Sequence, residues 1–504
     1  MASHDSRPRQ PAVTARRISK TALDLLRGGT SSNLREHETG HGWDVTGAEG
    51  EWDWEVDAAT AAASRRPASI VCPFMSLSHD AQYLVCGTAR TFLVLKNVED
   101  EYLPASAVVK FDDDNDDITA MLCLPLFVPS TVRSRPASIS LLIVVGFRSG
   151  CFKIYDETGS VCMSHLLNPS PIISIKLRAV SAISLVVDPE PDADEVLIVH
   201  DDKTAVSIDG PSLWMAVKVV AGHREIGEYT EQPSLTYSKW TFSQQREIKD
   251  LVSFGPAGAT VIAPAAFNPT SGTFAETRQS ARFIGVGRPM ITFYGTSVSR
   301  QSYSLKNVAS KVSQAVTSAV FSFAKTVWTH TPSSLTGATT PHHAAPPAAE
   351  AAVPPPSLVP PICTLSDPQR RVLTITLSPA CPHTGKTPLA ALTDNLGRVL
   401  LVDVEEGEII RIWKGMRDAQ CAWQQVWSEE TGRVQLMLVI YTARGVLEVF
   451  RVRHGPRVSA VFVGQDMTLV QTAVGVLGAA YGGSTALMLA SCLLISPTGV
   501  VRPA

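Results

Sequence analysis

Several features that mark metal-binding and disulfide-stabilised proteins are missing from this 504-residue chain. No two of its nine cysteines are spaced as C-x-x-C, and their number is odd. Some of them lie inside apolar runs, as Cys72 and Cys86 do. Zinc sites and disulfide frameworks need cysteines in pairs at short spacings. We therefore expect reduced, buried thiols in a cytoplasmic protein, and no metal site.

An excess of charge of one sign is also missing, since the net charge is only −3. Such a chain has no global field that would attract nucleic acid, so we expect no nucleic-acid partner. The N-terminus lacks the apolar core of a secretory signal. Residues 1–35 carry seven basic and two acidic side chains, and a short helix fits residues 16–26. An organelle transit peptide and a disordered tail are both compatible with this pattern, and Pro8, Pro11 and Asp5 favour the tail.

Complete catalytic and nucleotide-binding motifs are missing too. Gly385-Lys386-Thr387 resembles the end of a phosphate-binding loop, but Ala380 stands where that motif needs glycine. The sequence contains neither a G-x-S-x-G nor an H-E-x-x-H pattern, and His342-His343 has no ligand partner at a suitable spacing. A dispersed active site stays open as an alternative. We expect a protein that is not an enzyme and holds no cofactor.

An acidic run at residues 112–117 invites comparison with calcium-binding loops. An EF-hand loop starting at Asp112 would need glycine at its sixth position and glutamate at its twelfth, and these positions hold Asp117 and Cys123. We expect a solvated acidic turn between strands. Weak calcium binding, or contact with a basic partner, is the alternative.

What the chain does contain, from residue 68 onward, is a series of short apolar runs separated by Gly, Asp and Asn. The segment GCFKIYDETG at residues 150–159 recurs in outline as GRVLLVDVEEG at 397–407 and GVLEVFRVRHG at 445–455. Each copy has a glycine turn, an alternating strand and a second turn, as in part of a propeller blade. We therefore predict an all-β fold, a WD-repeat-like β-propeller. About 430 strand-bearing residues at roughly 50–60 per blade allow seven or eight blades, and we expect seven.

Two segments interrupt this pattern. Residues 305–330 read as an inserted amphipathic helix, because apolar residues recur there at spacings of three and four. Residues 331–361 are rich in Pro and Ala and predict a disordered linker. Residues 1–60 are expected to be a disordered tail, basic and then acidic, whose tryptophans could still dock on a groove. The propeller would then occupy residues 61–304 and 362–504.

The C-terminal residues 467–501 contain no charged side chain. Two strands at 471–480 and 486–495, joined by a Gly-Gly turn, would complete the last blade. The alternative is a membrane tail anchor at residues 467–495, because about 20 apolar residues can span a bilayer.

A strand that runs into a glycine turn at residues 409–420 is the candidate partner-binding site. In the functional interpretation its arginines and tryptophan anchor a protein interface, for which these residue types are enriched. In the structural interpretation the tryptophan packs under the blade edge and the charges bridge neighbouring blades. The candidate residues are Arg411, Trp413, Lys414, Arg417 and Asp418.

The same region resembles the N-terminal domain of the regulatory, non-catalytic subunit of the Rab-three GTPase-activating protein. The resemblance rests first on LTDNLGRVLLVDV at 392–404 and IRIWKGMRDAQ at 410–420, and covers roughly residues 40–500. Further matches in the same order are IVVGFRSG at 143–150, LLNP at 166–169, VSIDGPSL at 206–213, YSKW at 237–240, VASKV at 308–312, SAVF at 318–321, GVLEVF at 445–450 and GPRV at 455–458.

This resemblance implies a β-propeller in a subunit that pairs with a catalytic GTPase-activating (GAP) subunit. The pair would act on Rab GTPases in vesicle traffic, stimulating hydrolysis and, on a Rab of the endoplasmic reticulum and lipid droplets, nucleotide exchange. The arginine finger would belong to the catalytic partner, so no catalytic residue is expected here. Membrane association would be peripheral, at the endoplasmic reticulum. Family members continue into a long helical region, on which heterodimer formation and exchange would depend.

Overall fold

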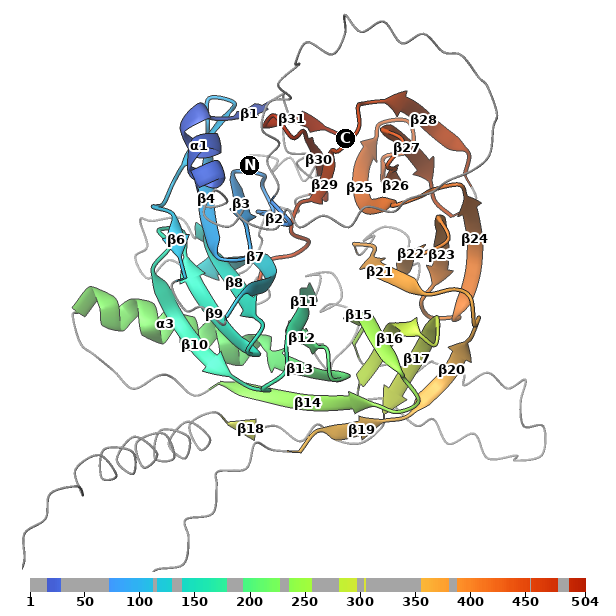
Figure 1. Ribbon diagram of the computed structural model, residues 1–504, viewed down its shortest axis with the longest axis horizontal. Coiled ribbons are helices and arrows are strands. Elements are labelled where there is room, and N and C mark those ends of the chain that lie inside the picture. The colour runs from blue at the N-terminus through green and yellow to red at the C-terminus, as the bar shows by residue number, and fades with distance from the viewer. Residues whose placement is uncertain are drawn as a thin grey trace, which may run out of the picture.

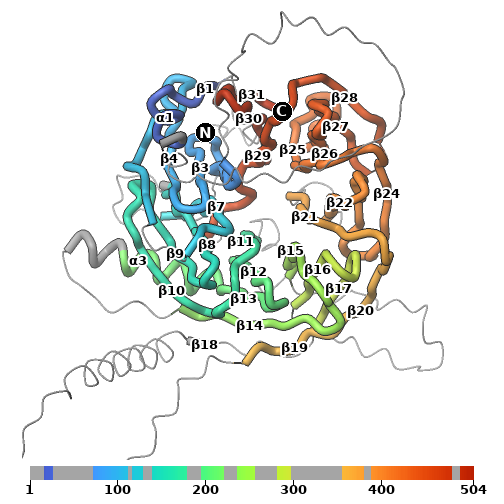
Figure 2. Tube along the Cα trace, in the orientation of Figure 1, coloured from blue at the N-terminus to red at the C-terminus, as the bar shows by residue number. Residues whose placement is uncertain are grey.

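The computed structural model describes residues 16–28, 72–111, 116–128, 138–178, 194–226, 235–255, 281–296, 303–304, 355–379, 388–453, 455–478 and 489–504. Within these ranges the chain is mostly β-strand, with two helices, α1 (Lys20–Gly28) and α3 (Gly210–Ile226). The sheets are arranged around a common centre, and the chain visits them in sequence order (Figures 1 and 2). The fold is therefore all-β and propeller-like, as the sequence predicts.

Five of the sheets are separate blades, each built mainly from strands that follow one another in the sequence. In each blade the four main strands follow one another in order from the centre of the ring to its rim (Figure 1). The first two blades contain β7 (Ile118–Val128), β8 (Ser138–Phe147), β9 (Cys151–Asp156) and β10 (Val161–Leu166), then β11 (Ile172–Arg178), β12 (Glu195–His200), β13 (Thr204–Asp209) and β14 (Thr236–Phe242), with β18 (Tyr303–Ser304) and β19 (Ser357–Val359) paired to β14. The next three contain β15 (Glu247–Ser253), β16 (Ala281–Arg288), β17 (Ile291–Thr296) and β20 (Pro361–Leu365); β21 (Val372–Leu377), β22 (Leu389–Asp394), β23 (Arg398–Asp403) and β24 (Glu408–Lys414); and β25 (Gln420–Ser428), β26 (Arg433–Tyr441), β27 (Val446–Arg451) and β28 (Arg457–Phe462).

The remaining sheet has nine strands and joins the beginning of the chain to its end. The strand β1 pairs in parallel with β5 and antiparallel with β31, so it links the first strands of the ring to the last. The members of this sheet are β1 (Arg16–Ile18), β2 (Phe74–Leu77), β3 (Tyr83–Gly87), β4 (Thr91–Val98), β5 (Glu101–Pro104), β6 (Val109–Lys110), β29 (Thr468–Gln471), β30 (Cys492–Ile495) and β31 (Val500–Pro503).

The apolar runs of the sequence become middle strands that are buried on both faces. All six residues of β22 are buried. Ala390 and Leu392 pack in the apolar cluster shared with the blade β15-β16-β17-β20, whereas Leu389 and Ala391 pack in the cluster shared with the blade β25–β28. Alternate residues of one strand thus bury their side chains against different neighbours, which is what radial packing of small sheets requires.

The antiparallel order of the strands places two kinds of connection on one face of the ring. These are the turns between the second and third strands of each blade and the segments that lead into its first strand. We call this the loop face. The two kinds of connection are tied by the same backbone hydrogen bond in four blades, from Arg148 N to Asp117 O, Asp201 N to Pro171 O, Asn395 N to Arg371 O and Ala443 N to Arg417 O. Their N···O distances are 2.9, 2.9, 3.0 and 3.2 Å.

Residues 16–28 depart from the disordered tail expected for residues 1–60. Arg16 is buried in β1, where its Nη1 donates to the carbonyl of Ala81 at 2.5 Å and to the Tyr102 hydroxyl at 3.1 Å. The Ser19 side chain caps α1 by accepting from the Ala22 amide at 3.2 Å. A basic residue that would be solvated in a free tail is therefore part of the ring closure, because buried acceptors replace its water.

The insertion lies within a blade rather than between blades. The strand β18 precedes residue 305 and β19 follows residue 354, and both pair with the outer edge of β14. The next strand, β20, then completes the blade that begins with β15. The linker expected at 331–361 is wrong at its end, because residues 357–359 form β19 and residue 361 begins β20. The helix expected at 305–330 lies outside the described residues.

The C-terminal apolar segment supplies strands to the ring. β29 and β30 pair antiparallel. The strand predicted at 471–480 is wrong over its described part, because β29 ends at Gln471 and residues 472–478 belong to no strand. The strand predicted at 486–495 is confirmed at its end, where β30 lies. After β29 the chain crosses toward β7, where Leu477 exchanges two backbone hydrogen bonds with Pro125 and Phe127. Among the described residues, no helix is both long and apolar enough to cross a membrane.

Candidate functional site

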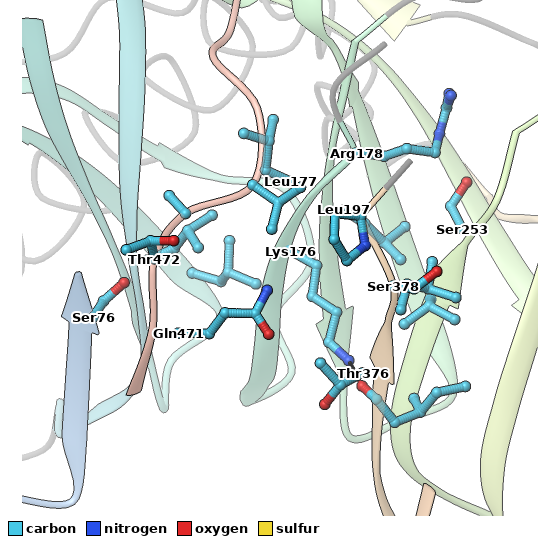
Figure 3. Close-up of a pocket in the computed structure, with 18 of the residues that line it drawn as sticks. Ser76, Lys176, Leu177, Arg178, Leu197, Ser253, Thr376, Ser378, Gln471 and Thr472 are labelled. Atoms are coloured by element: carbon cyan, nitrogen blue, oxygen red, sulfur yellow. Dashed lines mark hydrogen bonds between the residues drawn. The ribbon is translucent and has the colours of Figure 1, made fainter. Parts of the chain in front are cut away.

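The central cavity, of about 420 Å³, is lined by inner strands from around the ring (Figure 3). Its Lys176 extends from β11 and donates from Nζ to Asp250 Oδ2 at 2.6 Å and to the carbonyl of Ile375 at 2.8 Å. Asp250 also accepts from the Ile375 amide at 3.1 Å and from Ser174 Oγ at 3.0 Å. These contacts tie three blades together, so the charged groups at the centre are engaged in structural hydrogen bonds.

A second ion pair in the cavity is held in the same way. Arg178 Nε lies 3.0 Å from Glu195 Oε2, and Glu195 also accepts from the hydroxyl groups of Ser207 and Ser253. Glu195 is buried, and a buried carboxylate needs such partners to offset its lost hydration. Both cations that line the cavity, Lys176 and Arg178, are therefore paired with carboxylates.

The acidic run at 112–117 is described only at its last two residues. Asp116 accepts from the amide and the hydroxyl of Ser149, both at 2.9 Å. Asp117 lies 3.4 Å from Arg90 and 3.3 Å from Arg148. Both carboxylates are half-buried and connect turns of the loop face. The solvated turn expected for the run stays a prediction, because residues 112–115 lie outside the described ranges. No group of three or more His, Cys, Asp or Glu side chains suited to a metal occurs in the described ranges. The motif at 385–387 and the histidines at 342–343 lie outside them.

The expectation of buried thiols is confirmed for four of the eight described cysteines, Cys72, Cys86, Cys123 and Cys492, whereas three others are half-buried and Cys363 is exposed. Burial raises the pKa of Cys123, Cys421 and Cys492 to about 12. A thiol with so high a pKa is protonated at neutral pH and is a poor nucleophile. None of the eight described cysteines forms a disulfide bond.

Two of the five predicted partner-binding residues join neighbouring blades. Trp413 on β24 is buried, and its ring centroid lies 4.9 Å from that of Phe450 on β27. The Arg411 guanidinium lies 4.8 Å from the Trp413 ring centroid, and its Nη1 donates to the carbonyl of Gly455 at 2.8 Å. The structural interpretation of the sequence thus describes Arg411 and Trp413.

The other three predicted residues are exposed at the loop-face end of β24. Lys414 ends the strand, and Arg417 and Asp418 lie in the connection to β25. The connection packs on the turn before β23, where Gly397 has a φ of +73° and its carbonyl accepts from the Met416 amide at 2.8 Å. A Cβ at Gly397 would lie 2.8 Å from Arg417 Cγ, so a side chain there would displace Arg417.

Neighbouring cations on the loop face were missed by the sequence analysis. Arg444 lies in the turn before Gly445, directly beside the Arg417 connection through the Ala443–Arg417 hydrogen bond. Arg371 precedes β21 and contacts the turn at Asn395, from whose Oδ1 its amide nitrogen lies 2.8 Å. Arg444 directly precedes the repeated segment at 445–455, so its place in a turn could have been predicted from the sequence. Arg371 lies outside the repeated segments, in the connection before β21, and its place beside the turn at Asn395 follows only from the folded ring.

Comparison with known proteins gives a family match over most of the chain. The family described as "Rab3 GTPase-activating protein regulatory subunit N-terminus" matches residues 72–470. A similar curated protein is the "Rab3 GTPase-activating protein regulatory subunit" of Caenorhabditis elegans, 33% identical over 89 residues. That alignment covers 18% of this chain and 6% of the relative. Among solved structures, Saccharomyces cerevisiae Sqt1 is similar with a TM-score of 0.36 and 11% identity, over 85% of this chain and 82% of that one.

Proposed function

Because the chain belongs to the family of Rab3 GTPase-activating protein regulatory subunits, through the N-terminal region of that family, we propose that it is a non-catalytic regulatory subunit. In this role it binds a catalytic GAP subunit and modulates the activity of Rab GTPases in vesicle traffic. The match over residues 72–470 is the observation that carries the proposal. Stimulated nucleotide exchange on a Rab and peripheral association with the endoplasmic reticulum are further parts of it.

The chemistry of GTP hydrolysis would then reside in the catalytic partner. The central charges of this chain support such a division, since Lys176 and Asp250 are bound to each other and to the backbone. A rigid ring is suited to the task left to this subunit, which is to present loops in a fixed arrangement.

We also propose that the ring counts seven blades. The nine-stranded sheet would comprise two of them. One is the meander from β2 to β5, and the other contains β29, β30 and β31 with β1 as its outer strand. Support comes from the inner strands, because β2 and β29 contact each other as neighbouring inner strands do elsewhere in the ring.

The partner surface is proposed to include the exposed end of β24. Lys414, Arg417 and Asp418 would contact the partner directly. Arg411 and Trp413 would act indirectly, by fixing β24 against the blade that carries Phe450. Lys414 ends the strand, and backbone hydrogen bonds to Gly397 and Ala443 hold the connection that carries Arg417 and Asp418. Groups that are already ordered lose little entropy on binding, which favours affinity.

The test is a capture experiment with purified proteins. The chain is immobilised and incubated with a catalytic GAP subunit of the Rab-three type, a Rab GTPase, or both. Retention of the catalytic subunit, with or without the Rab, is the expected result. Retention of neither protein would overturn the proposal and leave only a propeller that binds other partners. An unrelated propeller protein on the same support measures nonspecific retention.

A further inference from the structure

The charges of the loop face are distributed unevenly around the ring. The three blades that begin with β15, β21 and β25 carry nine cationic side chains in the connections of this face, at the adjoining strand ends. These are Arg246, Lys249, Arg288, Arg370, Arg371, Arg398, Lys414, Arg417 and Arg444. The carboxylates of the same connections are Glu247, Asp367, Asp418 and Asp466, together with the buried Asp394, so the cations exceed the carboxylates by four. We call this set of connections the basic sector.

The rest of the described loop face lacks this excess. In the connections around β3, β7, β8, β11 and β12 the described cations are Arg90, Lys110, Arg148 and Lys203, against an equal number of carboxylates, Asp116, Asp117, Asp201 and Asp202. The face therefore has two electrostatically different halves. The net charge of the chain is −3, so a local excess of four positive charges comes from the arrangement of the charges and not from the overall composition.

The cations of the basic sector lie on one continuous surface. The Arg417 connection is bound to the Gly397 turn through the Met416 amide at 2.8 Å and to the Arg444 turn through the Ala443 amide at 3.2 Å. On its other side, the turn at Asn395 is bound to Arg371, whose Nη1 lies 3.3 Å from Glu247 Oε1. Direct contacts thus connect cations of three blades.

The carboxylates within the sector do not neutralise it. Glu247 alone faces three cations, with Lys249 at 2.7 Å, Arg371 at 3.3 Å and Arg288 at 3.8 Å. The hydrogen bond from Lys249, followed by the charges of Lys249 and Arg371, holds the pKa of Glu247 below its usual value. Four other cations, which are exposed, have no carboxylate partner among the described residues, namely Arg246, Lys414, Arg417 and Arg444.

We propose that the basic sector docks a carboxylate-rich surface of a partner protein, an inference that rests on the proposed function as a regulatory subunit. Seven of the nine cations are arginines, whose planar guanidinium groups bind carboxylates with two parallel hydrogen bonds. Leu396, with 47% of its surface exposed, lies beside Gly397 near the middle of the sector and offers an apolar contact. Interspersed acids such as Asp418 give the surface a charge pattern, which suits a protein surface better than the uniform charge of a lipid bilayer.

The test compares two double charge reversals on the same blade. Arg417→Glu with Arg444→Glu alters the basic sector. Arg433→Glu with Arg451→Glu makes the same change in net charge at the opposite end of the blade, where both side chains are also exposed. Circular dichroism and Tm show first that both variants fold like the unmodified chain.

Binding is then measured with the catalytic GAP subunit and with a Rab, at low and at physiological salt. We expect the basic-sector variant to raise Kd about tenfold or more for one of these proteins. The control variant should stay within about twofold of the unmodified chain. The affinity of the unmodified chain should also fall as salt is added.

Three results would overturn the inference. Equal Kd values for the two variants would show that the basic sector makes no contact with the partner. The basic-sector variant could instead lose binding to vesicles of phosphatidylcholine and phosphatidylserine while its Kd for both proteins stays unchanged. That result would identify a membrane surface as the ligand of the sector. If the unmodified chain binds neither protein, the proposed function fails, and this inference fails with it. The Kd of the unmodified chain therefore distinguishes failure of the proposed function from failure of this inference alone.

Discussion

The Arg411 guanidinium lies 4.8 Å from the ring centroid of Trp413. The same guanidinium donates a hydrogen bond to the Gly455 carbonyl in the next blade, so one arginine both covers the buried indole and crosses the boundary between two sheets. This pair occupies the segment that the sequence singles out as a candidate interface. Its contacts explain why an Arg and a Trp occur there without requiring either to touch a partner.

Replacement of Trp413 should therefore reduce stability. Trp413→Ala removes a buried aromatic side chain that packs on Phe450 and leaves a cavity, which costs about 3 kcal/mol in free energy of unfolding. Urea denaturation measures the loss. Lys414→Ala, one residue away and exposed, is the matched control and should change the free energy of unfolding by less than about 0.5 kcal/mol. Equal effects of the two substitutions would contradict the assignment of Trp413 to the core.

The ring closure through β1 makes a second prediction. Removal of residues 1–19 deletes the strand that pairs with both β5 and β31, together with the buried Arg16. This deletion removes three buried side chains, those of Arg16, Ile18 and Ser19. The Tm should therefore fall by roughly 5 °C or more. Removal of residues 1–14 leaves β1 intact and serves as the control. If the two truncated chains melt at the same temperature, β1 does not hold the ring closed.

Acidification should destabilise the protein through His165. Burial lowers the pKa of His165 from 6.5 to about 4 in the folded chain. Between these values the unfolded state binds the proton and the folded state does not, so stability falls as pH decreases from about 6.5 to 4 and is retained above that window.

The variant His165→Gln removes this titration while keeping a polar side chain. Its free energy of unfolding, measured by urea denaturation at several pH values, should depend less steeply on pH than that of the unmodified chain. Because other buried groups such as His200 also have a lowered pKa, a reduced slope rather than a flat profile is expected. Parallel profiles of the two proteins would show that the pKa of His165 is the same in the folded and unfolded states, and would contradict the lowered pKa.

Thiol alkylation provides a fourth prediction. Cys363 is exposed on the outer strand β20, whereas Cys123 and Cys492 are buried thiols whose pKa burial raises to about 12. Iodoacetamide at neutral pH should label Cys363 first, as followed by mass spectrometry of tryptic peptides. After denaturation in urea all three cysteines should react. Early labelling of Cys123 or Cys492 in the native chain would contradict their burial.

Much of the fold could be predicted from the sequence because its signals are local. Short apolar runs with glycine turns, such as the one at Gly397, indicate strands without reference to the rest of the chain. The short helix that fits residues 16–26 overlaps α1, but the strand β1 could not be assigned in this way. Arg16 reads as a solvated charge until Ala81 and Tyr102 are brought beside it, and those contacts span 65 and 86 positions in the sequence.

The candidate site was only partly predictable for the same reason. The segment at 409–420 was found from its composition, but composition does not say which side chains cross to the next blade. Arg411 and Arg417 look alike in the sequence. Only the ring places the first over Trp413 and the second on the loop face beside Arg444. Helix α3 was missed, because its apolar residues do not form a clear one-sided stripe.

The central claim is that this chain regulates a Rab GTPase through a separate catalytic subunit. Single-turnover GTP hydrolysis by a Rab-three-type GTPase tests it most directly, measured with the catalytic subunit alone, with this chain alone, and with both. We predict no acceleration by this chain alone and a changed hydrolysis rate when it joins the catalytic subunit. Acceleration by the chain alone, or an unchanged rate under conditions where the catalytic subunit is active, would contradict the account.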